Sequence, residues 1–227
     1  MSVTRFRKRK PHPISAERSL SDSDANVRSE LIGKNLLAAQ PVLNALAHIG
    51  FRIGTIADLF NRKLDYRAAV PILVRWLPEV SNPSVKEDIV RALPVRWAKP
   101  TAVLPLIEEF EQADERVAPS LKRAIANALS FIADDRVFEQ ISLLARDRRH
   151  GRAREMLALA LGNMSDQRAV DVLIDLLVDD EVAGHAIMAL GKLRADSAKA
   201  RIRCFESHRN AWIRREAHKA IKRIEGK

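Results

Sequence analysis

The chain has 227 residues, a single cysteine and a formal net charge of +10. Apolar residues make up 47%, enough to bury a core, whereas only 5% are aromatic, which argues against a β-sandwich. The lone cysteine, Cys204, excludes an internal disulfide framework and favours a reducing, cytoplasmic location. No apolar run reaches the roughly 20 residues of a membrane span, and the N-terminus lacks the apolar segment of a secretory signal. The charge favours an anionic partner, although a basic protein without such a partner is the alternative.

Residues 1–24 are expected to form a disordered basic tail. Five cations lie within six positions, and they are Arg5, Arg7, Lys8, Arg9 and Lys10. Two prolines and a Ser/Asp-rich run follow, and the apolar content is too low for folding. The cluster could be an electrostatic arm for nucleic acid, but a solvated tail is the favoured interpretation. Asp22 or Asp24 is expected to cap the first helix.

Residues 25–64 are expected to form an irregular helical cap. Apolar residues from Leu31 to Ile49 recur at helical spacing. Pro41 is expected to break or kink this helix, and Gly50 resembles a stop signal. A shorter helix is expected from Ile53 to Arg62. Repeat arrays need such atypical ends, although the region could instead be a sixth repeat.

From Asp65 onward the sequence repeats itself at intervals of 29 to 36 residues, which predicts stacked helix pairs. The second helices of the pairs end on a small residue followed by Leu or Ile, at Ala92-Leu93, Ala128-Leu129, Ala160-Leu161, Ala189-Leu190 and Ala220-Ile221. First helices are expected at 67–77, 102–110, 136–145 and 168–177. The small residues allow close approach, Gly162 and Gly191 are expected to loosen helix ends, and Pro94 is expected to stop its helix.

The segment DQRAVDVLIDLLVDDEVAGHAIMALGKLRAD (166–196) resembles a HEAT repeat of the short kind also seen in bilin-lyase-like proteins. The resemblance covers 65–227, in repeats at 67–99, 100–134, 135–166, 167–196 and 197–227. It implies an all-α fold, a right-handed α/α superhelix of about five to six helix pairs that bury their faces against each other. Three repeats are preceded by Asp-x-Arg, at 65–67, 134–136 and 166–168, where the Asp can cap the helix and the Arg can bridge repeats.

In HEAT proteins the first helices usually form the convex face and the second helices the concave face. Segments around the expected second helices carry a net charge of about +12, and those around the first helices about −5. Seven residues before the repeated Leu or Ile, four of five equivalent positions are basic, namely Lys86, Lys122, Arg154 and Arg214. Four further cations lie near them, namely Arg91, Arg123, Arg215 and Lys219. These eight residues are the predicted basic row, which could attract a polyanion; alternatively, the first four bridge adjacent repeats.

No pattern of catalytic or ligand-binding residues is recognisable. None of the six histidines forms a pair at i, i+4 spacing, one cysteine cannot complete a zinc cluster, and no Gly-rich phosphate loop or Gly-x-Ser-x-Gly occurs. We therefore expect no metal, no cofactor and no enzymatic activity. Several acidic residues of the first helices are expected to be solvated on the convex face, namely Glu108, Glu109, Glu111, Asp175, Asp179 and Asp180.

Two enzymatic uses of HEAT-like repeats are alternatives. Alkylpurine DNA glycosylases resemble this chain in architecture, and they use tryptophans and a carboxylate in a concave cleft to stabilise a cationic base. Here Trp76 is expected in packing, Trp97 has no carboxylate nearby, and Trp212 has Glu216 one turn on, which an arginine could simply pair with. For bilin attachment, the only cysteine, Cys204, is expected to be buried on a first helix.

The leading hypothesis is a non-enzymatic interaction module that binds an acidic protein or peptide on its basic concave face. The alternative is binding of duplex nucleic acid without sequence specificity. Duplex is preferred over single strands in that alternative, because the face lacks a set of aromatic residues for stacking.

Overall fold

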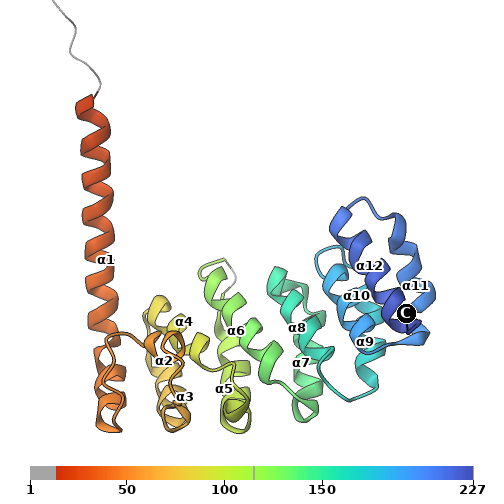
Figure 1. The fold of residues 1–227 in the computed structure, drawn as a ribbon, viewed down its shortest axis with the longest axis horizontal. Helices are drawn as coiled ribbons and strands as arrows, with labels where there is room; N and C mark the ends of the chain where they lie inside the picture. The colour runs from red at the N-terminus through yellow and green to blue at the C-terminus, as the bar shows by residue number, and fades with distance from the viewer. Residues whose placement is uncertain (1–13, 115, 227) are drawn as a thin grey trace, which may run out of the picture.

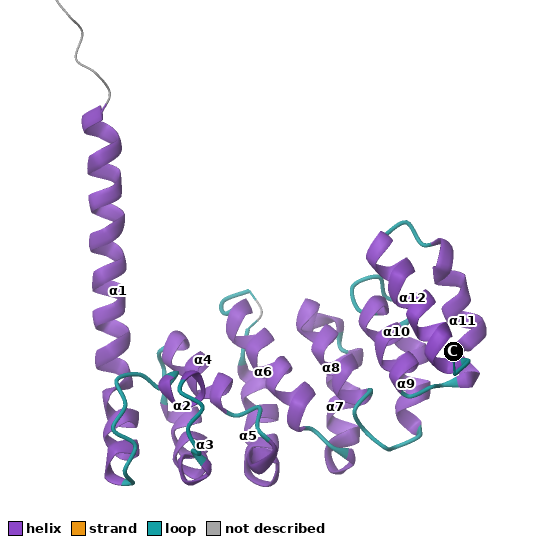
Figure 2. Ribbon diagram, viewed as in Figure 1, coloured by secondary structure: helices purple, strands orange, loops and turns teal. Residues whose placement is uncertain are grey.

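Stacked helices make up the molecule. The computed structural model describes residues 14–114 and 116–226, with side chains from Val27 onward. Every regular element in these ranges is a helix, and the helices stand side by side in one curved row (Figures 1 and 2). The predicted all-α solenoid is confirmed. The basic cluster from Arg5 to Lys10 lies outside the described residues.

Five successive helix pairs build the row. The first helices of the pairs are α3 (Val70–Glu79), α5 (Lys99–Gln112), α7 (Phe138–Arg146), α9 (Arg168–Leu176) and α11 (Lys199–Arg203). The second helices are α4 (Pro83–Ala92), α6 (Pro119–Ile132), α8 (Arg154–Leu161), α10 (Ala183–Lys192) and α12 (Ala211–Ile224). Short 3-10 turns join them, at η1 (Arg67–Ala69), η2 (Arg96–Ala98), η3 (Asp135–Val137), η4 (Arg148–Ala153), η5 (Asp196–Ala198) and η6 (Cys204–Ser207).

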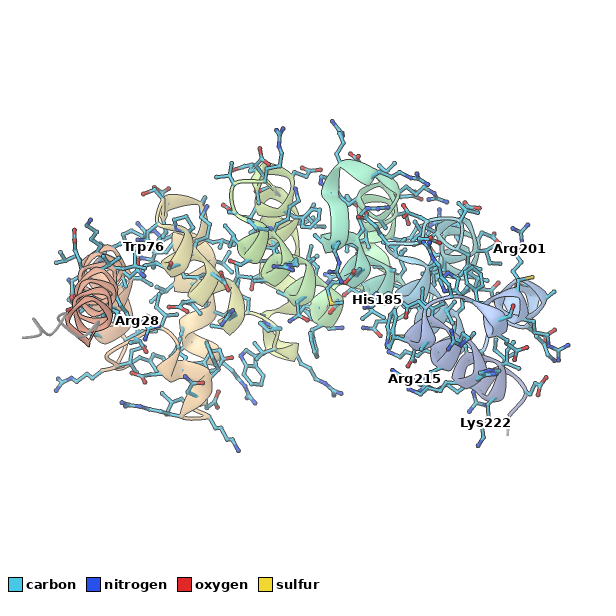
Figure 3. All side chains as sticks on the ribbon, turned by 90° about the horizontal axis from the view of Figure 1, so that it is seen from above. Arg28, Trp76, His185, Arg201, Arg215 and Lys222 are labelled. Carbon is cyan, nitrogen blue, oxygen red and sulfur yellow. The ribbon has the colours of Figure 1, made fainter. Side chains whose placement is uncertain are left out.

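The row is curved, and its two layers of helices lie on opposite sides of the curve. Seen from above, Trp76 of α3 and Arg201 of α11 lie on the outer side of the arc (Figure 3). Arg215 and Lys222 of α12 lie on the inner side (Figure 3). We call the five first helices the outer layer and the five second helices the inner layer.

The N-terminal helix α1 (Ile14–His48) is longer than any other and rises beyond the row (Figure 1). It begins at Ile14 rather than at a cap on Asp22 or Asp24, because no proline and only one glycine interrupt the stretch up to Gln40. It also continues through Pro41, contrary to the expected break. Pro41 is exposed, so the carbonyl that loses its backbone partner can bond to water.

The C-terminal third of α1 packs onto the first pair. Leu46 of α1 is fully buried together with Leu59 of the one-turn helix α2 (Asp58–Asn61). Asn82 donates a hydrogen bond to Asn35 at 2.9 Å, and Gly50 adopts a φ of 99° just after the helix ends. A long helix followed by a single turn does not repeat the geometry of the later pairs. We propose that α1 and α2 cap the stack.

Two glycines set the spacing of the inner layer. A Cβ on Gly162 would lie 2.6 Å from the Cβ of Ala189, and one on Gly191 would lie 2.7 Å from that of Ala220. Both glycines have neighbours in the next repeat, and Gly162 has an ordinary helical φ of −68°. Their role is therefore close approach between repeats rather than the loosening of a helix end that we expected.

The Asp-x-Arg motifs stabilise the entries to the first helices. The Asp166 carboxylate accepts the backbone N–H of Arg168 at 2.9 Å and its guanidinium at 2.7 Å. Arg168 also reaches Glu139 of the preceding repeat at 2.5 Å, so the motif both caps and bridges, as predicted. The motif at Asp134 caps in the same way.

Candidate interaction surface

The four equivalent cations of the predicted basic row point into the stack. Arg154 is only 1% exposed and Lys122 only 3%, and Lys86 and Arg214 are half-buried. Each one has a partner within the fold. Burial and these internal partners argue against a binding role for the four residues. Arg154 and Lys86 bridge adjacent repeats, whereas Lys122 and Arg214 hold loops of their own repeats.

Arg154 links α8 to the loop of the next repeat. Its guanidinium contacts Asp179 and Glu181, each at 2.9 Å, and donates to the carbonyl of Gly151 at 3.0 Å. Burial alone would raise the pKa of Asp179, but the hydrogen bonds from Arg154 and from the Glu181 N–H hold that pKa below its usual value. Asp179 is thus part of an inter-repeat bridge and not the solvated residue that we expected.

Lys86 of α4 bridges to the outer layer of the following repeat. Its Nζ lies 2.6 Å from Oε2 of Glu109 on α5, and both side chains are largely buried. Glu109 was expected on the solvated convex face. It is inward because it follows Leu106 by three residues and continues the buried stripe of α5.

Lys122 and Arg214 hold loops of their own repeats. The Lys122 ammonium donates to the carbonyl of Ala113 at 2.5 Å and lies 4.7 Å from the centre of the Phe110 ring. Arg214 donates to the carbonyl of His208 at 2.6 Å. Basic residues at this position therefore satisfy loop carbonyls or carboxylates, which explains their recurrence without a ligand.

The other four residues of the basic row are exposed. Arg91 pairs with Glu87 at 2.5 Å and Lys219 with Glu216 at 2.7 Å, whereas Arg123 donates to the backbone carbonyl of Pro119. Together the inner-layer helices expose seven cations, namely Arg91, Arg123, Lys192, Arg215, Lys219, Lys222 and Arg223. Within those helices no Asp or Glu is exposed.

The outer layer has a mixed charge instead. Its helices expose six carboxylates, namely Glu79, Glu108, Glu111, Glu139, Asp171 and Asp175. They also expose five arginines, namely Arg75, Arg146, Arg168, Arg201 and Arg203. The difference in sign between the layers therefore survives the removal of the buried cations.

Two adjoining hollows lie along the inner layer. The first, of about 440 Å³, lies between α4 and α6 and is lined mainly by polar residues that include Glu87, Arg91 and Arg123. The second, of about 300 Å³, lies across α6, α8, α10 and α12. Both include Asn127, so the two hollows adjoin each other at α6.

The second hollow has an apolar floor that sequence analysis did not single out. It contains Phe131, Met156, Leu159 and Met188, with Lys192 and Arg223 also lining it. These apolar residues resemble core residues in type, so composition cannot distinguish them. Their positions could have done so, because they fall outside the buried stripe of each helix.

The tryptophans do not assemble a cleft. Trp212 covers Gly184, where a Cβ would lie 2.0 Å from the indole, and its ring centroid lies 5.0 Å from that of His185. Glu216 pairs with Lys219 rather than with a neighbouring arginine. Trp97 packs edge-on against Tyr66 at 5.8 Å. Packing against helix neighbours thus accounts for Trp97 and Trp212.

Cys204 is exposed, contrary to expectation. Helix α11 ends at Arg203, and Ile202 is its buried residue. Cys204 begins the 3-10 turn that follows, so its side chain is not on the buried side of the helix. Across residues 14–114 and 116–226, no group of three His, Cys, Asp or Glu side chains could hold a metal ion. No helix in that part of the chain is long and apolar enough to cross a membrane.

Recurring helix pairs that share one hydrophobic core define the class of protein as an all-α repeat solenoid. The profile of the PBS lyase HEAT-like repeat matches residues 153–179, which contain α8 and α9. The match is consistent with the HEAT-like character of the repeats. The matched segment joins the second helix of one pair to the first helix of the next. Among curated proteins, none matches the sequence.

Proposed function

We propose that this protein is a non-enzymatic interaction module that binds an acidic protein or peptide along its inner layer. HEAT-like repeats generally act as protein-interaction scaffolds. The observation that supports an acidic partner is the set of seven exposed cations on inner-layer helices that expose no carboxylate. Glu87 also lines the first hollow, but the exposed side chains of this layer carry a clear excess of positive charge. Such a surface attracts a negatively charged segment from a distance and favours its binding.

The test compares charge reversal on the two layers. The inner variant is Arg123→Glu with Arg215→Glu, and the matched outer control is Arg75→Glu with Arg201→Glu. All four arginines are exposed on helices. Each variant replaces two arginines by two glutamates, so the change in net charge is the same. The probe is a fluorescein-labelled Glu-rich peptide, and fluorescence anisotropy gives its Kd. We expect about a tenfold weaker Kd for the inner variant only; an equal loss in both variants would show that net charge alone drives binding.

Duplex nucleic acid is the second candidate. It is favoured by the run of exposed cations on α12, namely Arg215, Lys219, Lys222 and Arg223. A gel shift with random duplex at two salt concentrations tests it, since phosphate-driven binding weakens steeply with salt. If the duplex binds more tightly than the Glu-rich peptide at about 0.15 M salt, nucleic acid replaces protein as the proposed partner.

A further inference from the structure

We propose that the inner layer contains an anchor pocket for a bulky apolar side chain of the acidic partner. We define the anchor pocket as the part of the second hollow that is lined by Phe131, Met156, Leu159 and Met188. The inference rests on the proposed function and adds the chemistry of the partner segment: bulky apolar residues at its centre and Asp or Glu on both sides.

The pocket lies outside the core of the repeats. Phe131 is 62% exposed in the last turn of α6, beside the fully buried Leu129 and Ile132. Met156 and Leu159 of α8 and Met188 of α10 are half-buried. Three successive repeats thus contribute apolar side chains to one hollow of about 300 Å³. An apolar patch ringed by polar residues is typical of a binding site.

Equivalent positions show how the charge is arranged around it. Two residues before the repeated Leu or Ile, successive inner-layer helices carry Arg91, Asn127, Leu159, Met188 and Lys219. All five are at least partly exposed. This row has a cation at each end and apolar side chains toward the middle. A complementary segment has acidic residues at its ends, opposite the cations, and apolar residues at its centre.

Two cations also lie at the pocket itself. Lys192 of α10 donates to the side-chain carbonyl of Asn163, whose amide donates to the carbonyl of Ser130 at 2.6 Å. This chain of hydrogen bonds crosses from α10 through the end of α8 to α6 and holds the ammonium at the edge of the hollow. Arg223 of α12 lines the same hollow. A carboxylate next to the anchor side chain can therefore pair with a cation that is already positioned.

The apolar walls favour a peptide over nucleic acid as the occupant. A sugar-phosphate backbone can pair with the cations but leaves an apolar hollow unfilled. A peptide can fill it with Leu, Phe or Met, and the two methionines allow the pocket to adapt to different shapes.

The experiment selects peptides and then tests the pocket. A display library of random peptides of about 16 residues, long enough for several turns of helix, is panned on the full-length protein. We expect enrichment of peptides that combine bulky apolar residues with flanking Asp or Glu. For an enriched peptide, Phe131→Ser and Met188→Ser should each raise the Kd by about tenfold. The control, Leu104→Ser on the outer-layer helix α5, replaces an apolar side chain whose exposure (56%) is close to that of Phe131 and should not change the Kd.

Each outcome separates the pocket from the broader proposal. If Arg123→Glu with Arg215→Glu weakens binding but both serine variants stay within about twofold of wild type, the anchor pocket is wrong and the acidic partner stands. If enriched peptides lack acidic residues, or none is enriched, the proposed function itself is wrong. If the protein self-associates in sedimentation and Phe131→Ser abolishes this, the occupant is a second copy. Melting curves verify that every variant is folded.

Discussion

Arg154 shows at the scale of a single residue how this fold uses its positive charge. The guanidinium is almost completely buried and contacts two carboxylates of the next repeat. Arg154→Ala should lower the free energy of unfolding by about 3 kcal/mol, because it leaves the largely buried Asp179 without its partner. Urea unfolding measures the change. Arg215→Ala, an exposed arginine on α12, is the control and should stay within about 0.5 kcal/mol; equal effects would mean that Arg154 is not a bridge.

His185 makes the stability depend on pH. Burial lowers the pKa of His185, and the carboxylate of Glu155 only partly opposes this. The unfolded chain therefore takes up the proton first as the pH falls below about 6.5. We expect the melting temperature to fall as the pH decreases from 7 toward the folded pKa. His185→Gln should make this decrease smaller.

The decrease should not disappear in that variant, because burial also lowers the pKa of His150. A profile unchanged by His185→Gln would show that the proton uptake occurs elsewhere.

The direction of single side chains was the hardest feature to predict. The spacing of Lys86, Lys122, Arg154 and Arg214 correctly placed them at one equivalent position, but it could not tell surface from interior. That depends on whether a carboxylate or a loop carbonyl of a neighbouring segment lies within reach, as Glu109 does for Lys86. Such partners come from other repeats or from the far side of a turn, so local periodicity carries no information about them.

At the scale of the elements, contact between small residues controls how closely neighbouring pairs pack. Gly162→Ala would place a Cβ 2.6 Å from the Cβ of Ala189, so α8 and α10 must move apart. We expect a loss of about 1–3 kcal/mol in the free energy of unfolding. Adding Ala189→Gly should restore part of it, as a double-mutant cycle would show. Gly33→Ala in α1, where no atom beyond the adjacent residues and backbone of the helix itself lies within 4 Å of the new Cβ, should cause no loss.

Helix pairs were predictable because the apolar residues that face the shared core recur at regular intervals in the sequence. The matched Ala-Leu positions of α6, α8 and α10 are buried as the repeat requires. The start of α1 and its course through Pro41 were not predictable in this way. Where a helix is exposed to solvent, water can replace a missing backbone hydrogen-bond partner. A proline such as Pro41 then need not end the helix.

At the scale of the whole molecule, the two ends of the row differ in how much they contribute to stability. A solenoid is stabilised mainly by contacts between neighbouring repeats, so each end should matter in proportion to what it covers. Helix α12 packs on α10 through Gly191 and Ala220. The first part of α1, in contrast, rises above the row with no other described element beside it (Figure 1).

Truncation at each end tests this difference. Removal of residues 1–30 should leave the urea midpoint unchanged, because Asn35, which bonds to Asn82, and the buried Leu46 remain. Removal of 197–227 uncovers the face of α10 that carries Gly191, so we expect a lower midpoint and a smaller m-value, since less surface is exposed on unfolding. Circular dichroism at 222 nm follows both transitions. If the two truncations lowered the midpoint equally, the N-terminal helix would stabilise the stack as much as the last repeat does. Helix α1 would then be more than a cap.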